Sequence, residues 1–500
     1  MKKLQVIYNT LMFAGLLTMF ASCNNGLEEI NIDPNQSTNN PSIDLLFGSV
    51  VPGFIGQVSG SYEVPGQFAQ QFAILNSAEG TLTQDDDAIS RRTWEIAYSE
   101  NGGALRSIEL MKFEAEKQGN DTYVAVGNIL KVYMLSYMTD LFGDIPYVDA
   151  GQAFRLEDKY IFPAYDAQAD VYKAMIADLE QANTLLANAD ANQSIDAARD
   201  LLFQGDKMGW RKFANSLRLR LLMRQSKATN VSSDVAAIFS NPSQFPVFES
   251  NADAALFEFV LADTWPLSAS QANIDDVRLS ATLVDIMKGA GGVNQLANVE
   301  DPRLAWLLNP TANSVTAGTP AYVGQPVGLA SDVTLPEDRS LLSDNVKNLN
   351  KFWLMTYAEL NFLKAEAIAQ GMIGGSALEA YEAGVKASLS KYGIDATSTQ
   401  SAAYLASLAA RFSGNELKHI AIQRWMDQPN YGFEGYAVWR RTGFPTLSLG
   451  PDVVASQIPT RYFYSSKTTD KNQVNADVAI SRAPLNGVNT ILQKVWWDVN

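Results

Sequence analysis

The only cysteine in the 500-residue chain, Cys23, stands directly after a short apolar segment near the amino terminus. Two lysines precede this segment, Leu11 to Phe20 form its apolar core, and Ala21-Ser22 place small side chains before the thiol. A core of this length is too short to cross a bilayer, which takes about 20 apolar residues, so the pattern is typical of a cleaved secretion signal. A thiol at the first mature position can accept acyl chains, and two or three chains anchor a protein stably. The sequence predicts a signal peptide at 1–22 and lipidation of Cys23.

One position departs from the usual lipoprotein signal. Phe20 lies three residues before Cys23, where such signals favour Leu, Val or Ile. The alternative is therefore an ordinary secretory signal followed by a chance cysteine. Because no second cysteine exists to form a disulfide with this thiol, we favour lipidation. Residues 23–42 are mostly polar and are expected to form a tether between the lipid and a single folded domain at 43–500.

Charge and histidine content exclude several kinds of chemistry. Without the signal, 36 basic side chains face 54 acidic ones, a net charge of −18, which would repel the phosphates of nucleic acid. His419 is the only histidine, so a multi-histidine zinc site cannot form within one chain. A Ser-His-Asp triad would have to use His419, which lies in a helical apolar pattern and is expected in the core. From these residues we expect no metal site and no cofactor, and a catalytic triad is disfavoured.

Apolar side chains recur every three or four residues along much of the chain after Ile43, the period of amphipathic helices. This period predicts helices over 123–142, 166–186, 208–224, 352–370, 376–392, 405–412 and 416–426. Ala365, Ala377 and Gly384 are small enough to let the helices over 352–370 and 376–392 approach closely. Strand signals are few, at 255–261 and 462–464. The fold class is therefore mostly α.

Ala377, Tyr381 and Gly384 have the spacing of the second helix of a tetratricopeptide repeat. The repeats are degenerate and separated by long insertions, so a regular solenoid is not expected. The largest irregular stretch, Asn309 to Asp344, is rich in Gly and Pro. Structured loops on a rigid helical frame commonly carry binding function.

Six short segments follow one another along the chain in a specific order. They are Cys23 with Ile32-Asp33-Pro34-Asn35, then Asp140–Tyr147, Asp301–Leu304, Tyr357–Ala367, Trp439–Gly443 and Ile458–Arg461. Each is a weak signal alone. Their order and spacing resemble the SusD/RagB family of nutrient-binding outer-membrane lipoproteins over nearly the whole mature chain.

This resemblance implies a frame of about four irregular tetratricopeptide-like helix pairs packed against a loop-rich half with few short strands. It also implies a lipid-anchored outer-membrane protein, facing the cell exterior, that captures oligosaccharides or peptides. Its partner would be a TonB-dependent transporter of the SusC type, on which it would sit as a lid. The alternative is a helical-repeat scaffold of the outer membrane that binds only protein. The resemblance implies that the protein is not an enzyme, and no local carboxylate motif supports a third function, an inverting glycosidase.

The family motifs themselves are expected to pack. Asp140–Tyr147 contains a helix stop at Gly143 and closes a repeat. The segment Tyr357–Ala367 is expected in a helix with its Glu and Lys side chains in solvent. Arg440 and Arg441 are expected to form a partly buried cation pair that meets carboxylates.

A sugar-binding site needs aromatic faces with amide or carboxylate groups at their edges. Trp94, Tyr98 and Asn101 resemble a family helix that can present an aromatic ring and an amide to a sugar, although Trp94 and Tyr98 could equally be core. Trp265, followed by proline in a loop, is the favoured platform. Tyr322, in the Gly/Pro-rich stretch, is a further candidate. Trp497 and the other tryptophans are expected to pack in the core or at the C-terminus.

Overall fold

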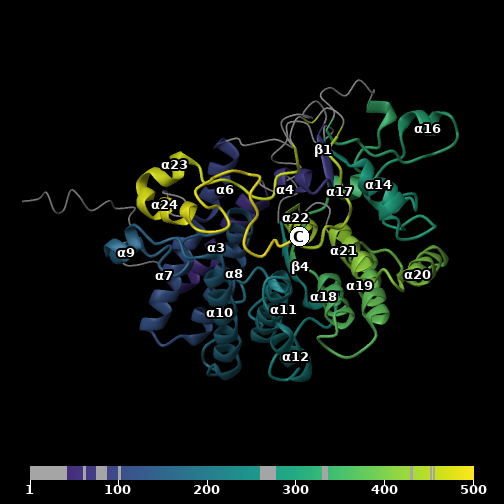
Figure 1. Ribbon diagram of the computed structural model, residues 1–500. Helices are drawn as coiled ribbons and strands as arrows, with labels where there is room; N and C mark the ends of the chain where they lie inside the picture. Colours follow the sequence, from purple (N-terminus) through teal and green to yellow (C-terminus); the bar gives the residue numbers. More distant parts are fainter. Residues whose placement is uncertain are drawn as a thin grey trace, which may run out of the picture.

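The computed structural model describes residues 42–59, 63–74, 87–98, 103–259, 277–328, 336–427, 432–450, 453 and 456–500. The fold is mostly helical, with 58% helix and 5% strand, as the sequence predicted. Helices α10, α11, α12, α18, α19 and α20 follow one another along the lower edge of the molecule in Figure 1. Shorter helices and loops form the upper half, and the C-terminus lies between the two halves.

The helices differ widely in length. The longer ones are α3 (Ile43–Ser59), α6 (Asp87–Tyr98), α7 (Ala104–Lys117), α8 (Asp121–Phe142), α10 (Gln168–Asn188), α11 (Lys207–Gln225), α18 (Tyr357–Ala369), α19 (Ala377–Lys391), α20 (Thr399–Phe412), α21 (Glu416–Asp427) and α22 (Gly432–Thr442). The shorter ones are α4 (Glu63–Phe68), α9 (Asp158–Ile161), α12 (Ser232–Ser240), α14 (Ala281–Met287), α15 (Leu304–Leu307), α16 (Ala312–Thr316), α17 (Asp344–Lys347), α23 (Ser466–Thr469) and α24 (Gln473–Ser481).

Two small antiparallel sheets complete the described fold. Strand β1 (Phe72–Ile74) pairs with β3 (Val277–Leu279), and β2 (Ala255–Glu258) pairs with β4 (Lys351–Met355). Each sheet joins segments that lie far apart in the sequence. With two short strands each, the sheets tie distant parts of the chain together and form no layer of their own.

Helix α8 is the centre of the N-terminal half. Every residue from Thr122 to Phe142 is buried, because α7, α10 and α11 pack around it. The side chain of Asn120 caps its start by accepting a hydrogen bond from Tyr123 N at 3.3 Å. The helix ends at Gly143, whose φ of 87° is strained for other residues. The predicted helix stop at Gly143 is confirmed.

The pair α18 and α19 shows why small residues recur between repeat helices. A Cβ atom added to Gly384 on α19 would lie 2.5 Å from the ring of Phe362 on α18. Only glycine permits the two helices to approach this closely. The prediction that Gly384 allows a close helix contact is confirmed.

Two local predictions were wrong. Residues 351–355 form strand β4 and not the start of a helix; helix α18 begins at Tyr357, after Thr356, whose side chain accepts a hydrogen bond from Glu359 N. Residues 462–464 form no strand: Tyr462 N donates to the carbonyl oxygen of Leu141, and Tyr464 N donates to the side chain of Asn489. Helix α20 also begins earlier than predicted, at Thr399.

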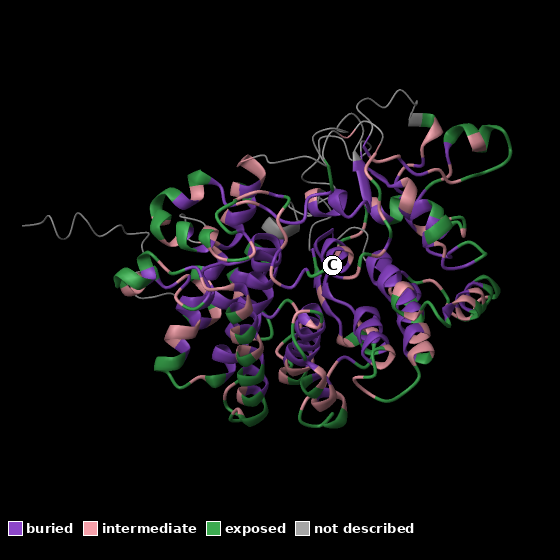
Figure 2. Cartoon of the chain, viewed as in Figure 1, coloured by how far each residue is buried: buried purple, intermediate pink, exposed green. Residues whose placement is uncertain are grey.

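The interior is continuous from the N-terminal to the C-terminal elements. A cluster of buried apolar side chains extends from Ile43 on α3 to Trp497 near the C-terminus. Figure 2 shows buried residues along the inner faces of the helical row and exposed residues at its outer ends. Across the described ranges, no helix combines the length and apolar character needed to span a membrane.

Candidate ligand-binding site

The predicted site residues divide into those that the structure describes and those that it does not. Cys23, Asn101 and Trp265 lie outside the described residues. Trp94 and Tyr322 lie within them, on α6 and in the loop after α16, respectively. The described part of the chain therefore reports directly on two of the predicted ligand contacts.

Trp94 lies on α6 with 5% of its surface exposed. Its indole packs against Tyr98 at a centroid distance of 4.5 Å, Phe142 at 5.1 Å and Tyr165 at 5.6 Å. The hydroxyl of Tyr98 donates to the carbonyl oxygen of Pro146 at 2.6 Å, and burial raises the pKa of Tyr98 well above its ordinary value. This environment favours a packing role for Trp94, because the indole offers little surface to a sugar ring.

Tyr322 is half-buried in the Gly/Pro-rich stretch after α16. Its ring packs against the core, and partial burial together with the nearby carboxylate of Glu300 raises its pKa. Among the described residues, its hydroxyl has no hydrogen-bond partner. A half-exposed ring with a free hydroxyl has the chemistry of a sugar contact, so Tyr322 stays a candidate.

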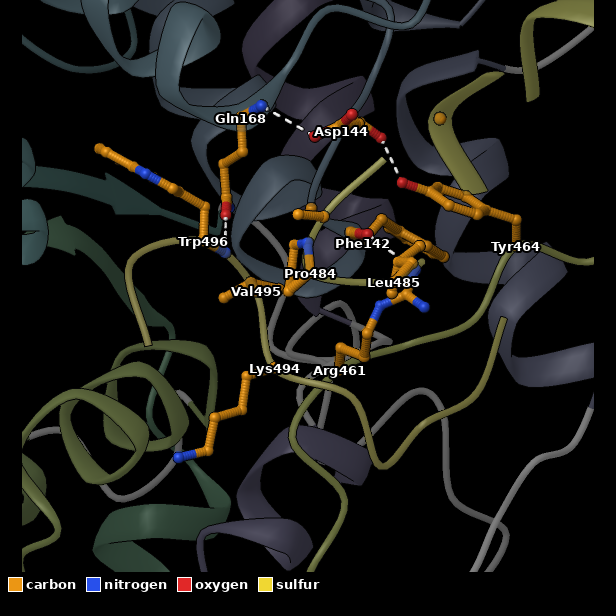
Figure 3. Close-up of a pocket in the computed structure, with 13 residues that line it drawn as sticks. Phe142, Asp144, Gln168, Arg461, Tyr464, Pro484, Leu485, Lys494, Val495 and Trp496 are labelled. Atoms are coloured by element: carbon orange, nitrogen blue, oxygen red, sulfur yellow. Dashed lines mark hydrogen bonds between the residues drawn. The ribbon is translucent and has the colours of Figure 1, made fainter. Parts of the chain in front are cut away.

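A narrow cleft lies where α8 ends, beside the C-terminal segment (Figure 3). Asp144 is central to it: its side chain accepts from Gln168 N at 2.9 Å and from Arg482 at 2.9 Å, and its carbonyl oxygen accepts from the Tyr464 hydroxyl at 2.7 Å. Gln168 in turn accepts from Trp496 N at 2.7 Å. The cleft has a volume of about 10 Å³, which suits about one water molecule and no sugar. The hydrogen bonds around the cleft hold the C-terminal segment against the repeats.

Five helices meet at a group of buried charged side chains, here called the buried charge cluster. Its members are Asp140 on α8, Arg220 and Arg224 on α11, Glu359 and Glu366 on α18, Arg424 on α21, and Glu434 and Arg441 on α22. Each is at most 7% exposed. The prediction that the glutamates of Tyr357–Ala367 face solvent was wrong, since both are in this cluster.

The buried charge cluster is held by short, paired hydrogen bonds. Arg220 binds Glu359 through Nε at 2.8 Å and Nη2 at 2.6 Å. Arg224 binds Asp140 at 2.8 Å and Glu434 at 2.7 Å. Burial would raise the pKa of Glu434, but the charges of Arg224, Arg220 and Arg424 hold it down at about 2. The four cations and four anions balance, which explains how so many charges tolerate burial.

Arg440 and Arg441 are both buried, more fully than the sequence suggested. Arg441 binds Glu366 at 2.6 Å, so the predicted contact with a carboxylate is confirmed for this residue. Arg440 instead donates to the carbonyl oxygens of Asp140 at 2.6 Å and Thr460 at 3.0 Å. Its guanidinium lies 4.7 Å from the ring of Trp497. Both arginines therefore hold the repeats together and do not face a ligand.

The single histidine is a core residue, as predicted. His419 lies on α21 with 1% exposure, close to the rings of Tyr381 and Phe412. Burial, with smaller contributions from the charges of Lys418 and Arg411, lowers its pKa to about 4. His419 is therefore neutral in the folded protein at neutral pH and is placed for packing.

We expect the folded state to lose stability in mild acid because of His419. The unfolded chain binds a proton near pH 6.5, whereas the folded chain binds it only near pH 4, so stability falls as pH drops between these values. The loss from this group is about 2 kcal/mol at pH 5. Urea unfolding of the wild type and of His419→Leu at pH 7 and pH 5 measures it. The difference in the free energy of unfolding between the wild type and His419→Leu should change by this amount, to the disadvantage of the wild type, from pH 7 to pH 5. The same difference at both pH values would contradict a lowered pKa for His419.

The sequence matches the family model for SusD-like proteins, described as starch-binding and associating with the outer membrane, over residues 34–465. The chain belongs to this SusD-like family. The sequence matches no curated protein. Within the described ranges, no group of three or more His, Cys, Asp or Glu side chains could hold a metal ion.

Solved structures agree with this membership. A chitin-binding protein is 28% identical with a TM-score of 0.74, and the match covers 92% of this chain and 100% of that protein. A SusD homologue from Bacteroides fragilis is 26% identical with a TM-score of 0.72, covering 92% and 99%. A chitin-binding SusD homologue from Flavobacterium johnsoniae shares the fold, at 23% identity with a TM-score of 0.72, covering 91% and 99%. SusD-like proteins are binding proteins associated with the outer membrane, and this chain has their fold over nearly its full length.

Proposed function

We propose that this SusD-like protein captures oligosaccharides at the cell surface and acts as the lid of a TonB-dependent, SusC-like transporter in the outer membrane. The observation that carries this proposal is the family match over 34–465. A relative of 28% identity is a chitin-binding protein, which favours a glycan over a peptide as the ligand.

The partnership with a transporter is tested by co-purification. The lipoprotein, carrying an affinity tag at its C-terminus, is recovered from outer membranes solubilised in mild detergent. We expect a TonB-dependent barrel to be recovered with it in a fixed ratio. Repeated recovery of the lipoprotein alone would contradict the role of lid.

We propose that Cys23 carries the lipid anchor. The Cys23→Ala variant should be released from the membrane fraction into the soluble fraction, because the acyl chains supply about 0.8 kcal/mol per buried methylene and the described helices offer no other membrane segment. The measurement is the distribution of the protein between the two fractions, and Ser22→Ala is the matched control. Unchanged membrane association of the cysteine variant would contradict lipidation.

We propose that Trp265 is the main aromatic contact of the glycan, with Asn101 and Tyr322 as further contacts and Trp94 as a supporting core residue. Stacking of a sugar on the indole buries apolar area that alanine cannot replace. Truncating such an anchor typically costs about 2 kcal/mol, or roughly 30-fold in affinity. Calorimetry of Trp265→Ala with the best glycan of an array screen should show this loss, while the melting temperature stays nearly unchanged.

A matched pair of variants separates the ligand role from packing. Tyr322→Phe keeps the ring and removes only the free hydroxyl, so we expect a small loss of affinity of about fivefold. Trp94→Phe should lower the melting temperature more than the affinity, because its ring is 5% exposed. If Trp265→Ala lowers the melting temperature and keeps full affinity, the site lies elsewhere.

A further inference from the structure

A polar recess opens between the end of α7 and the loop that follows α10. Its walls are residues 118–120 and 192–197, and Asp44 on α3 and Tyr123 on α8 complete it. The cavity has a volume of about 630 Å³, within the range of about 300–1,000 Å³ that is typical of small-molecule sites. We refer to it as the α7–α10 recess. It contains none of the residues considered above as ligand contacts.

The walls of the α7–α10 recess are tied together by hydrogen bonds. Gln193 Nε2 donates to the carbonyl oxygen of Gly119 at 2.7 Å, and Thr122 Oγ1 donates to the carbonyl oxygen of Gln193 at 3.1 Å. Tyr123 links the other sides: its hydroxyl donates to Asp44 and accepts from Asp196 N, the latter at 3.0 Å. Three distant segments of the chain therefore form one preorganised cavity.

Polar groups at the recess are left without partners. The side-chain amides of Gln118 and Asn192 and the hydroxyl of Ser194 are exposed, and within the described part of the chain they make no hydrogen bond. Oε1 of Gln193 is buried and, within the described part of the chain, accepts no hydrogen bond, an unfavourable arrangement for a polar atom.

These groups select one class of ligand. The carboxylate of Asp44 disfavours phosphates and other anions, whereas that of Asp196 is paired with Arg199 at 3.1 Å, and the lining is too polar for an apolar ligand. Amides and carboxylates match hydroxyl groups, each of which both donates and accepts a hydrogen bond. The cavity has room for sugar rings, but its one aromatic residue, Tyr123, is only 2% exposed and offers no face for stacking.

We propose that the α7–α10 recess is a second glycan contact that holds the hydroxyl groups of a neutral oligosaccharide by hydrogen bonds alone. This inference rests on the proposed function of glycan capture and places a contact apart from Trp265 and Tyr322. Because stacking is absent, the recess binds weakly by itself. A long polysaccharide held at another site gains avidity from it through a high effective concentration.

The test is hydrogen–deuterium exchange of the lipidated protein in detergent, with maltohexaose and chitohexaose as separate probes at millimolar concentrations. We expect saturable slowing of exchange in peptides that cover 118–123 and 192–197. The double variant Gln118→Ala/Asn192→Ala removes two hydrogen-bonding amides. It should weaken binding of the probe at the recess roughly 25-fold, about fivefold for each bond, so that protection needs a correspondingly higher probe concentration. Ser194→Trp, which fills the cavity, should abolish it. Gln400→Ala, an exposed amide on α20, is the matched control and should change nothing.

The outcomes separate this inference from the proposed function. Calorimetric binding of a probe without protection of these two segments would overturn the recess while leaving glycan capture in place. Equal protection of the double variant and the wild type would also overturn it. Glycerol at the same hydroxyl concentration is the control for a general polyol effect, and equal protection by glycerol would count against a glycan site. If neither probe binds anywhere, both the recess and the proposed glycan function fail for these sugars.

Discussion

Replacing Arg220 with alanine should lower the free energy of unfolding by about 3–5 kcal/mol. Arg220 is 1% exposed and binds both carboxylate oxygens of Glu359, while its Nη2 also donates to the carbonyl oxygen of Leu354 at 2.9 Å. Glu434 lies 3.7 Å from its Nη1. Removing the guanidinium leaves the buried carboxylate of Glu359 without its closest cation, and water cannot replace it in the packed interior.

A surface pair provides the matched control for Arg220→Ala. Lys117 binds Glu114 at 3.0 Å, but the lysine side chain is 52% exposed. Lys117→Ala should therefore cost well under about 1 kcal/mol, since solvent screens such pairs. Denaturant unfolding followed by circular dichroism measures both variants. Equal stabilities of the two variants would show that the buried charge cluster does not hold the helices together.

The helices could be predicted because their buried faces repeat with a local period. Helix α11 was predicted at 208–224 and spans Lys207–Gln225, and α19 was predicted at 376–392 and spans Ala377–Lys391. The apolar stripe of each helix depends only on neighbouring residues, so one sequence suffices to find it. The starts were less certain, as α20 shows, because caps such as Ser398 shift a boundary by several residues.

Strand β4 could not be predicted from local pattern. Phe352-Trp353-Leu354-Met355 is a continuous apolar run, which fits a buried helix and a buried strand equally well. Its strand conformation depends on pairing with β2, whose Leu256 lies opposite Trp353 almost a hundred residues earlier in the chain. The strand predicted at 462–464 was wrong for the opposite reason. Its alternating aromatic residues fit a strand, but the backbone forms hydrogen bonds with a side chain and with the end of α8 and not with a neighbouring strand.

The buried charge cluster was missed because charge normally indicates solvent. Glu359 and Glu366 lie on α18 among apolar residues, and nothing local distinguishes them from surface glutamates. Their partners, Arg220 and Arg441, come from α11 and α22. The two glutamates fall seven residues apart, on the same face of the helix, but this spacing alone does not indicate burial.

Prediction of the candidate ligand site from sequence was limited in the same way, because the deciding contacts come from distant parts of the chain. The spacing of Trp94 and Tyr98 puts both rings on neighbouring faces of α6, which is compatible with a sugar platform or with a core cluster. Phe142, Tyr165 and Tyr464 decide between them by packing around the indole, and they arrive from α8, from a loop and from the C-terminal segment. Sequence spacing defines which residues share a face, but only the tertiary structure defines what covers that face.

The C-terminal segment should be as important for stability as any repeat helix, and Trp497 tests this. The indole is fully buried, its Nε1 donates to Asp140 at 2.8 Å, and the guanidinium groups of Arg224 and Arg440 lie 5.6 Å and 4.7 Å from its ring. Trp497→Ala would leave a cavity beside the buried charge cluster and remove a donor from a buried carboxylate. We expect the free energy of unfolding to fall by about 3–5 kcal/mol.

Two further variants divide the effect of Trp497 into its parts. Trp497→Phe keeps much of the ring and its contact with Arg440 but loses the donor to Asp140, so its cost should be about 1–3 kcal/mol. Val499→Ala, in the same segment but 54% exposed, should change stability by less than about 0.5 kcal/mol. Urea unfolding of the three variants gives the ranking. If Trp497→Ala is no more destabilised than Val499→Ala, the C-terminal segment covers the repeats without stabilising them.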